Sequence, residues 1–137
     1  MNIVLISCVG GKKPYKCKAK DLYESPWFRY AWNYAHSLNP DKVFILSAKY
    51  GLVDPEMKIE PYDETLNTKT ADKIREWADK VLSSLRERTD LDKDTFIILA
   101  GEKYRKYLVD HLRKYDIPMK GFRIGQQLKW LKEQCAQ

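Results

Sequence analysis

Three short apolar runs, each about as long as a β-strand, constrain the fold of this chain more than any other feature. They occupy residues 3–7, 43–48 and 95–100, and all contain β-branched side chains. The runs are apolar throughout, without alternation, which is typical of strands covered on both faces. Segments with helical spacing of apolar residues separate them. This order predicts an α/β fold: a three-layer, mostly parallel β-sheet flanked by helices, Rossmann-like in arrangement.

The helices expected between the runs have recognisable start signals and apolar faces. Ser25 followed by Pro predicts a helix from 26 to about 38, with Ser25 as its N-cap. Residues 70 to about 88 have the spacing of an amphipathic helix. Further helices are expected from 102 to about 115 and from 125 onward, with a short fourth strand within 117–124. A chain of 137 residues has the length of one domain, so we expect a single domain over 1–137.

The expected sheet predicts where a ligand would bind. In open parallel sheets, ligands bind beyond the carboxyl ends of the strands. This rule brings together the segments that follow residues 7, 47 and 100. A long proline-interrupted segment, 49–68, starts at the same edge, and loops of this length in compact domains are usually functional. The sequence therefore predicts one binding site at this edge.

The position of the positive charge is more informative than the net charge of +6. Residues 1–20 contain no acidic residue, and the other 117 residues together carry only +1. The lysines of this basic loop are Lys12, Lys13, Lys16, Lys18 and Lys20. A localised positive patch attracts polyanions, although a lysine-rich loop can also be merely well solvated. Because the loop follows a strand end, its lysines are predicted to contact DNA or another nucleic acid.

The long segment carries the side chains best suited to chemistry. Lys49 supplies a positive charge or a nucleophilic amine, and Tyr50 and Tyr62 offer faces on which a base could stack. Asp63 and Glu64 lie in a turn, from which a carboxylate can project toward a ligand. Half-buried packing is the commoner role of a single tyrosine, and capping is the commoner role of a single aspartate. The concentration of these residues in one segment favours a functional site.

Further residues are expected to line the same site. Small residues at strand ends let a ligand approach the backbone. Ser25 caps a helix whose N-terminus could also attract phosphate. The other candidates for substrate contact are Ser7, Cys8, Tyr23, Ser47, Gly51, Gly101 and Gln127.

Several function classes have no support in the sequence. There is no Walker loop, no GxGxxG and no HExxH, and both histidines lie in expected helices. The three cysteines lack zinc-site spacing, so no metal and no cofactor is expected. Without a histidine in the loops, a Ser-His or Cys-His nucleophile is disfavoured. The odd cysteine count and the lack of a signal peptide or spanning segment predict a cytoplasmic protein with no membrane partner.

Several motifs resemble a known family. They are Leu5-Ile6-Ser7-Cys8, Ile45-Leu46-Ser47-Ala48-Lys49-Tyr50-Gly51-Leu52, Pro61-Tyr62-Asp63-Glu64-Thr65-Leu66, Leu99-Ala100-Gly101-Glu102-Lys103-Tyr104 and Gly125-Gln126-Gln127-Leu128. Together they resemble the YaaA-like, or peroxide-stress-like, family of small bacterial and phage proteins. Members of the wider group resemble uracil-DNA-glycosylase-like α/β domains, and some are associated with excision of modified bases such as hydroxymethylated uracil. The resemblance implies this fold and this chemistry.

Residues and resemblance together lead to the hypothesis of a DNA glycosylase, which hydrolyses the N-glycosidic bond of a modified base. Cleavage of that bond builds positive charge on the sugar, which a carboxylate stabilises. Asp63 is the candidate, with Glu64 as its substitute. Tyr50 and Tyr62 would stack on a flipped base, while the edge contacts would come from Ser7, Ser47 and Gln127.

Lys49 has more than one possible role in this hypothesis. It contacts a phosphate or the leaving group, or it forms a Schiff base that adds lyase activity. Two other functions remain open: a non-catalytic nucleic-acid-binding module, and an enzyme acting on free nucleosides or nucleotides. The chain is expected to be a monomer or a small homo-oligomer.

Overall fold

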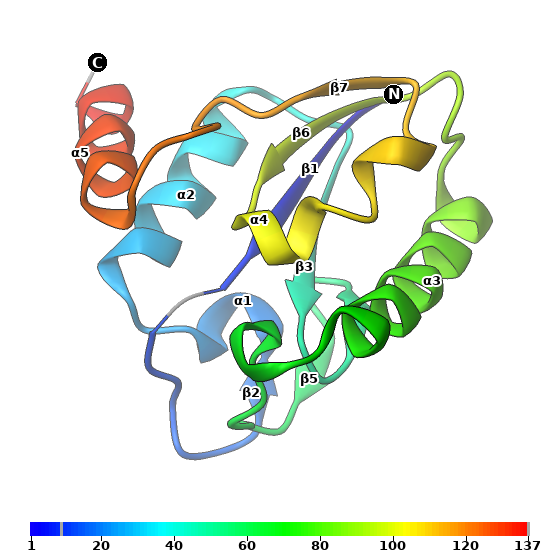
Figure 1. Cartoon of the computed structure of the whole chain (residues 1–137). Coiled ribbons are helices and arrows are strands. Elements are labelled where there is room, and N and C mark those ends of the chain that lie inside the picture. Colours follow the sequence, from blue (N-terminus) through cyan, green and yellow to red (C-terminus); the bar gives the residue numbers. More distant parts are fainter. Residues whose placement is uncertain (9, 137) are drawn as a thin grey trace.

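A computed structural model describes residues 1–8 and 10–136 (Figure 1). Its centre is a five-stranded sheet with the order β4–β3–β1–β6–β7. The strands are β1 (Asn2–Ser7), β3 (Lys42–Ser47), β4 (Gly51–Val53), β6 (Thr95–Leu99) and β7 (Lys114–Asp116). All neighbours pair in parallel except β4, which is antiparallel to β3. The three apolar runs are the three central strands, so the predicted mostly parallel α/β sheet is confirmed.

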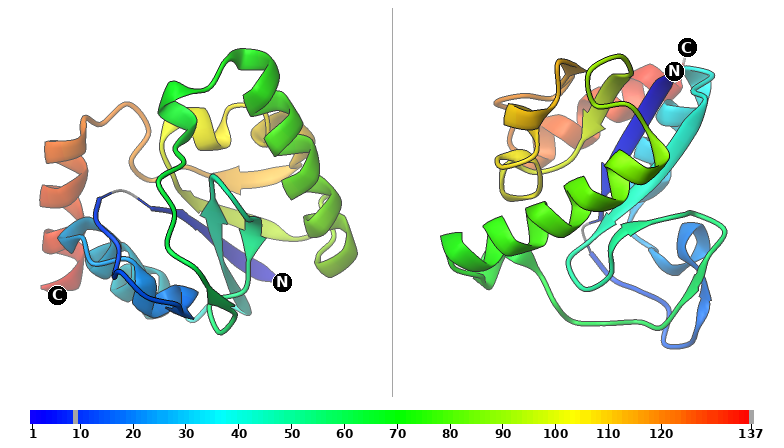
Figure 2. Two further views of the ribbon diagram at one scale, coloured as in Figure 1. Left: turned by 90° about the horizontal axis from the view of Figure 1, so that it is seen from below. Right: turned by 90° about the vertical axis from the view of Figure 1, so that its right-hand side faces the viewer.

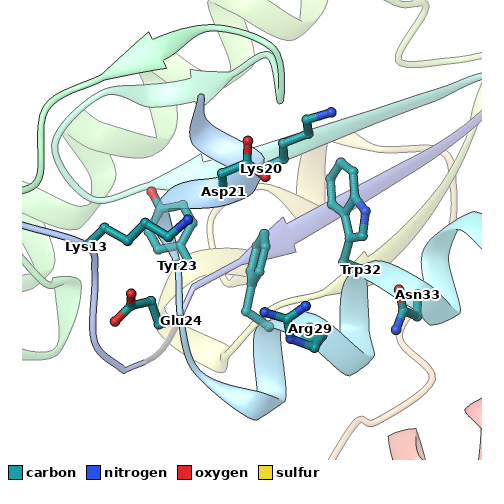
Figure 3. A pocket seen from close by; sticks show the side chains of 9 residues that line it. Lys13, Lys20, Asp21, Tyr23, Glu24, Arg29, Trp32 and Asn33 are labelled. Atoms are coloured by element: carbon teal, nitrogen blue, oxygen red, sulfur yellow. The ribbon is translucent and has the colours of Figure 1, made fainter. Parts of the chain in front are cut away.

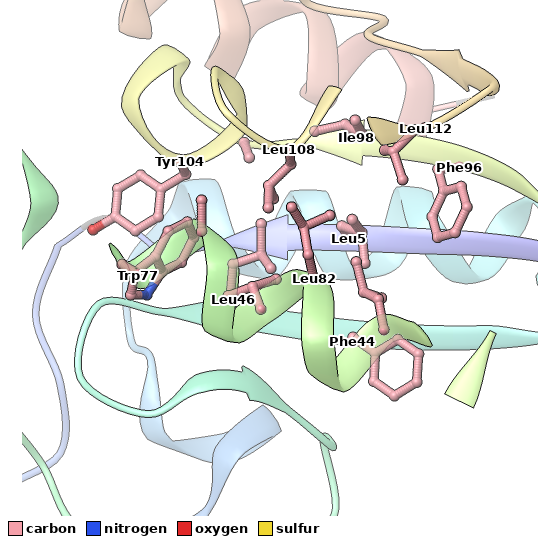
Figure 4. Close-up of a cluster of buried hydrophobic side chains, with 14 of the residues drawn as sticks. Leu5, Phe44, Leu46, Trp77, Leu82, Phe96, Ile98, Tyr104, Leu108 and Leu112 are labelled. Atoms are coloured by element: carbon pink, nitrogen blue, oxygen red, sulfur yellow. The ribbon is translucent and has the colours of Figure 1, made fainter. Parts of the chain in front are cut away.

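Helices cover both faces of the sheet. Successive side chains of β1 therefore alternate between two buried clusters, one on each face. Ile3 and Leu5 face α3 (Ala71–Arg88) and α4 (Glu102–Arg105), in the cluster drawn in Figure 4. Val4 and Ile6 face the opposite side, covered by α2 (Pro26–Ser37) and α5 (Ile124–Cys135). Figure 2 shows α2 and α5 on one side of the strands and α3 on the other. The layers are therefore helix, sheet and helix.

The basic loop and the long segment contain more regular structure than their sequences suggested. β2 (Cys17–Lys18) pairs antiparallel with β5 (Lys58–Ile59), and α1 (Ala19–Leu22) follows β2 directly. The amide of Ala19 donates to the carbonyl of Met57 at 2.8 Å, which extends this pairing. The small β2–β5 sheet therefore joins the two segments beyond the carboxyl ends of β1 and β3.

The region after β6 differs from the prediction. The expected helix over 102–115 is wrong, because α4 ends at Arg105 and is followed by a 3₁₀ turn, η2 (Val109–His111). Buried Tyr104, Leu108 and Leu112 have helical spacing, and this spacing caused the error. The fourth strand expected within 117–124 is also misplaced. The observed β7 is an exposed edge strand, whose ladder bonds require no apolar pattern.

None of the helices in the described part of the chain has the length and apolar character needed to cross a membrane.

Candidate functional site

A cavity of about 240 Å³ lies at the carboxyl ends of β1 and β3. Cys8 follows β1, Leu46 belongs to β3, and Tyr104 reaches the cavity from α4. The other lining residues come from the loop after β1 and from the long segment, which includes the 3₁₀ helix η1 (Leu66–Thr68). They are Gly10, Lys12, Tyr62, Asp63, Glu64, Thr65 and Asn67. We call this the rim cavity. It lies where the strand-end rule places a ligand.

A cluster of three tyrosines and one lysine adjoins the rim cavity. Lys12 and Tyr62 line the cavity itself, whereas Tyr23 and Tyr50, which were also expected there, line two neighbouring grooves. The hydroxyls of Tyr23 and Tyr62 are hydrogen-bonded at 2.7 Å. The ring of Tyr62 also lies edge-on to that of Tyr50, with centroids 5.7 Å apart. Lys12 holds its ammonium 4.5 Å from the centroid of the Tyr62 ring. Burial raises the pKa of Tyr23 and of Tyr62, so both hydroxyls are protonated at neutral pH.

Cys8 is a weakly acidic thiol within this cluster. Burial raises its pKa to about 12, although hydrogen bonding with Tyr23 and the charge of Lys12 act in the opposite direction. Its sulfur lies 3.7 Å from the carbonyl oxygen of Leu46, to which the thiol donates. Because only a thiolate is strongly nucleophilic, Cys8 is suited to lining the cavity and not to attacking a substrate.

Two carboxylates face the same cavity. Asp63 and Glu64 are exposed, and neither forms an ion pair or a side-chain hydrogen bond with another described residue. Asp63 shares the cavity with Lys12, as the sequence hypothesis requires. A carboxylate that has no cationic partner in the protein can stabilise positive charge that develops in a ligand.

Lys49 lies elsewhere. It lines a neighbouring groove between the turn after β3 and helix α3, and Asp63 does not line that groove. Glu64 borders both the groove and the rim cavity. The structure therefore brings Lys49 near the site but not into the same cavity as Asp63.

Ser47 and Gly51 shape the turn that places these residues. Ser47 is buried, and its hydroxyl accepts hydrogen bonds from the amides of Lys49 and Tyr50 at 3.3 and 3.0 Å. Gly51 has φ of +75°, a conformation that other residues rarely adopt, and there the chain turns back into β4. Neither residue lines the rim cavity, but both determine how the long segment leaves β3.

The five lysines of the basic loop do not form one patch. Lys13 and Lys20 line a groove of about 510 Å³ together with Arg29 and Trp32 of α2 (Figure 3). Lys18 and Lys20 also pair with Glu56 at 2.9 and 3.0 Å. Lys16 is exposed, which leaves Lys12 as the member that lines the rim cavity.

The remaining candidates have structural contacts. Ser25 caps α2 by accepting from the amide of Phe28 at 3.1 Å. The side chain of Gln127 accepts a hydrogen bond from the indole of Trp27 at 3.0 Å and donates one to the backbone carbonyl of Phe122. Gln127 lines neither the rim cavity nor the groove that contains Lys49. The amide of Gly101 donates to the buried hydroxyl of Ser7 at 3.3 Å, and both residues border a hollow beside the rim cavity.

The comparison with protein families gives a result over nearly the whole chain. The sequence model of a family of unknown function (DUF6884) matches residues 3–133. The chain belongs to the DUF6884 family. A search of curated proteins found no match. The matched span contains every residue that lines the rim cavity in this DUF6884 member.

Sequence reasoning missed several residues of the site in this DUF6884 member. Thr65, the N-cap of η1, and Asn67 within η1 line the rim cavity together with Tyr104. The amide of Leu66 lies 3.4 Å from the Tyr104 hydroxyl, to which it donates, and this contact fixes that wall. No local pattern indicates such a contact, since the partners are 38 residues apart. The groove that contains Lys49 was also not foreseen.

Proposed function

We propose that this DUF6884 member is a cytoplasmic enzyme that hydrolyses the N-glycosidic bond of a modified base in DNA. The YaaA-like resemblance makes 5-hydroxymethyluracil the first base to test. One observation carries the proposal: Asp63, Lys12 and Tyr62 line a single cavity beyond the carboxyl ends of parallel strands. The proposal extends to the fold, which we take to be a Rossmann-like domain of the uracil-DNA-glycosylase type.

The reaction suits these groups. The bond between C1′ of the sugar and the base nitrogen breaks, a water molecule adds its hydroxyl to C1′, and the departing base takes up a proton. Positive charge builds on the sugar in the transition state, and an adjacent carboxylate stabilises that charge or orients the water. Asp63 has this role in the proposal, because it faces the cavity without an ion-pair partner among the described residues.

The size of the cavity supports a single base as the ligand. Its volume of about 240 Å³ lies below the roughly 300–1,000 Å³ of pockets for drug-sized ligands. A base in a duplex enters such a cavity only after it has left the stack. Tyr62 then offers an aromatic surface, and Lys12 offers a positive charge toward a phosphate or the leaving base.

The test is base release from duplex oligonucleotides that carry a panel of modified bases. For Asp63→Asn we expect a loss of at least about a hundredfold in the cleavage rate, with unchanged DNA affinity. Asp110→Asn is the matched control. Asp110 is exposed and lines neither the rim cavity, nor the groove that contains Lys49, nor the hollow beside Ser7 and Gly101. Wild-type rates in both Asp63→Asn and Glu64→Gln would refute the carboxylate assignment. Failure of the wild type to release any base would refute the hydrolase.

A non-catalytic nucleic-acid-binding module is the second candidate. The lysines that line the grooves beside the rim cavity favour it, because lysines can bind phosphates without any chemistry. Binding of duplex DNA without abasic products would support it. Activity on free nucleosides, with little salt dependence, would instead support a small-molecule enzyme.

A further inference from the structure

The groove that contains Lys49 gathers positive charge from distant parts of the chain. It has a volume of about 230 Å³ and lies between the turn after β3 and helix α3. The lysines that line it are Lys49, Lys69, Lys73 and Lys80. We call it the lysine groove. The charge distribution along the sequence does not indicate it, because these four lysines are spread over 32 positions with acidic residues between them.

Helix geometry gives the groove its length. Lys73, Trp77 and Lys80 are spaced by four and three residues, so they share one face of α3. At 1.5 Å per residue, Lys73 and Lys80 are about 10 Å apart along the helix axis. Measured along the axis of B-form DNA, that distance corresponds to roughly three nucleotide steps of one strand. The groove therefore has the length to contact consecutive phosphates.

Most of the positive charge is available to a ligand. The acidic residues that line the groove are Glu64 and Glu76, and Lys73 approaches Glu76 at 3.9 Å. Within the described residues, Lys49, Lys69 and Lys80 form no ion pair. These ammonium groups therefore need not give up an internal partner in order to bind an anion.

The floor and the wall of the groove are fixed by contacts with the core. Trp77 is buried, and its indole N–H donates to the carbonyl of Ser47 at 2.8 Å. The ammonium of Lys49 lies 5.4 Å from the centroid of the Tyr50 ring, which in turn packs edge-on against Tyr62. The lysines thus project from anchored elements at both sides of the groove.

The lysine groove adjoins the rim cavity, because Glu64 borders both. We propose that the lysine groove binds the phosphodiester backbone of a DNA strand beside the nucleotide whose base occupies the rim cavity. This inference rests on the proposed function, which supplies that nucleotide. It makes the substrate a polymer, because a free nucleoside would leave the lysine groove empty. It also assigns Lys49 to phosphate binding and not to Schiff-base chemistry.

The experiment compares two triple variants that lose the same charge. The groove variant is Lys69→Gln/Lys73→Gln/Lys80→Gln. The control variant is Lys93→Gln/Lys114→Gln/Lys120→Gln, at exposed lysines that line neither the rim cavity nor the lysine groove. Fluorescence anisotropy with a labelled DNA duplex gives the dissociation constant across a series of NaCl concentrations, and base release is measured on the same proteins.

Each lost phosphate contact flattens the plot of log affinity against log salt by about 0.9. We therefore expect the slope of the groove variant to be less negative by about two to three, while the control variant keeps the wild-type slope. Equal slopes for the two variants, or no DNA binding by the wild type, would overturn the inference. If the groove variant does not fold, Lys80→Gln alone should reduce the slope by about one.

The two readouts separate the inference from the function on which it rests. A selective loss of slope without any base release by the wild type would refute hydrolysis but keep the lysine groove as a DNA site. Base release with equal slopes for the two triple variants would support hydrolysis and refute the groove. Equal slopes for the two triple variants, together with no base release by the wild type, would refute both.

Discussion

Cys8 should react slowly with a small disulfide reagent, and the rate follows from its surroundings. Its pKa of about 12, against an ordinary value of 9.0, lowers the thiolate fraction at pH 8. The reduction is about a thousandfold, because each pKa unit changes that fraction about tenfold at a pH well below both values. A thiolate of higher pKa is intrinsically more nucleophilic, with a Brønsted coefficient of about 0.4–0.5, which restores a factor of roughly 20. The net expectation is a rate roughly fiftyfold below that of a cysteine in an unstructured peptide.

The assay uses Cys17→Ser/Cys135→Ser, in which Cys8 is the remaining cysteine. The rate of modification is followed by mass spectrometry from pH 7 to 10.5, next to a reference peptide. For Cys8, log rate should rise by about one per pH unit across this whole range, whereas the peptide should level off near its own pKa. A plateau for Cys8 near pH 9 would refute the argument, because the thiol would then be an ordinary one.

Two further predictions concern stability, and urea unfolding checks both. Gly10→Ala should destabilise the fold by about 1–3 kcal/mol, because Gly10 has φ of +95° and an added Cβ would lie 2.7 Å from the Cβ of Ser25. Gly11→Ala, which has open space around the added carbon, is its control, and equal losses would contradict the clash. The Asp90 amide, which donates to buried Asp94 at 2.8 Å, holds the pKa of that carboxyl below its usual value. Asp94→Asn should therefore be less stable than wild type above about pH 4, with a difference that shrinks as acid protonates Asp94; a pH-independent difference would contradict this linkage.

The central sheet could be predicted from sequence because its physics is local. Each apolar run must be buried on both faces, and the parallel order of β3, β1 and β6 follows from the helices between them. The antiparallel turn into β4 had no such signal. It depends on Ser47 and Gly51, whose effect on the chain direction appears only when the turn is formed.

The candidate site was predictable in its location and only partly in its composition. The strand-end rule indicated the edge of the sheet, and Cys8, Lys12 and Asp63 do line one cavity there, whereas Tyr50 and the other lysines of the basic loop do not. Lys49 lies in a different groove from Asp63, because the chain reverses into β4 between these two residues. Composition also could not show that Glu56 pairs with two lysines of the basic loop, since such pairing needs the β2–β5 contact.

The β2–β5 pairing has a mechanical consequence. Two cavity walls that are far apart in sequence, around Lys12 and around Asp63, are tied by a backbone ladder and by the bond between Tyr23 and Tyr62. Neither wall can move outward without straining the other, so the two behave mechanically as one unit.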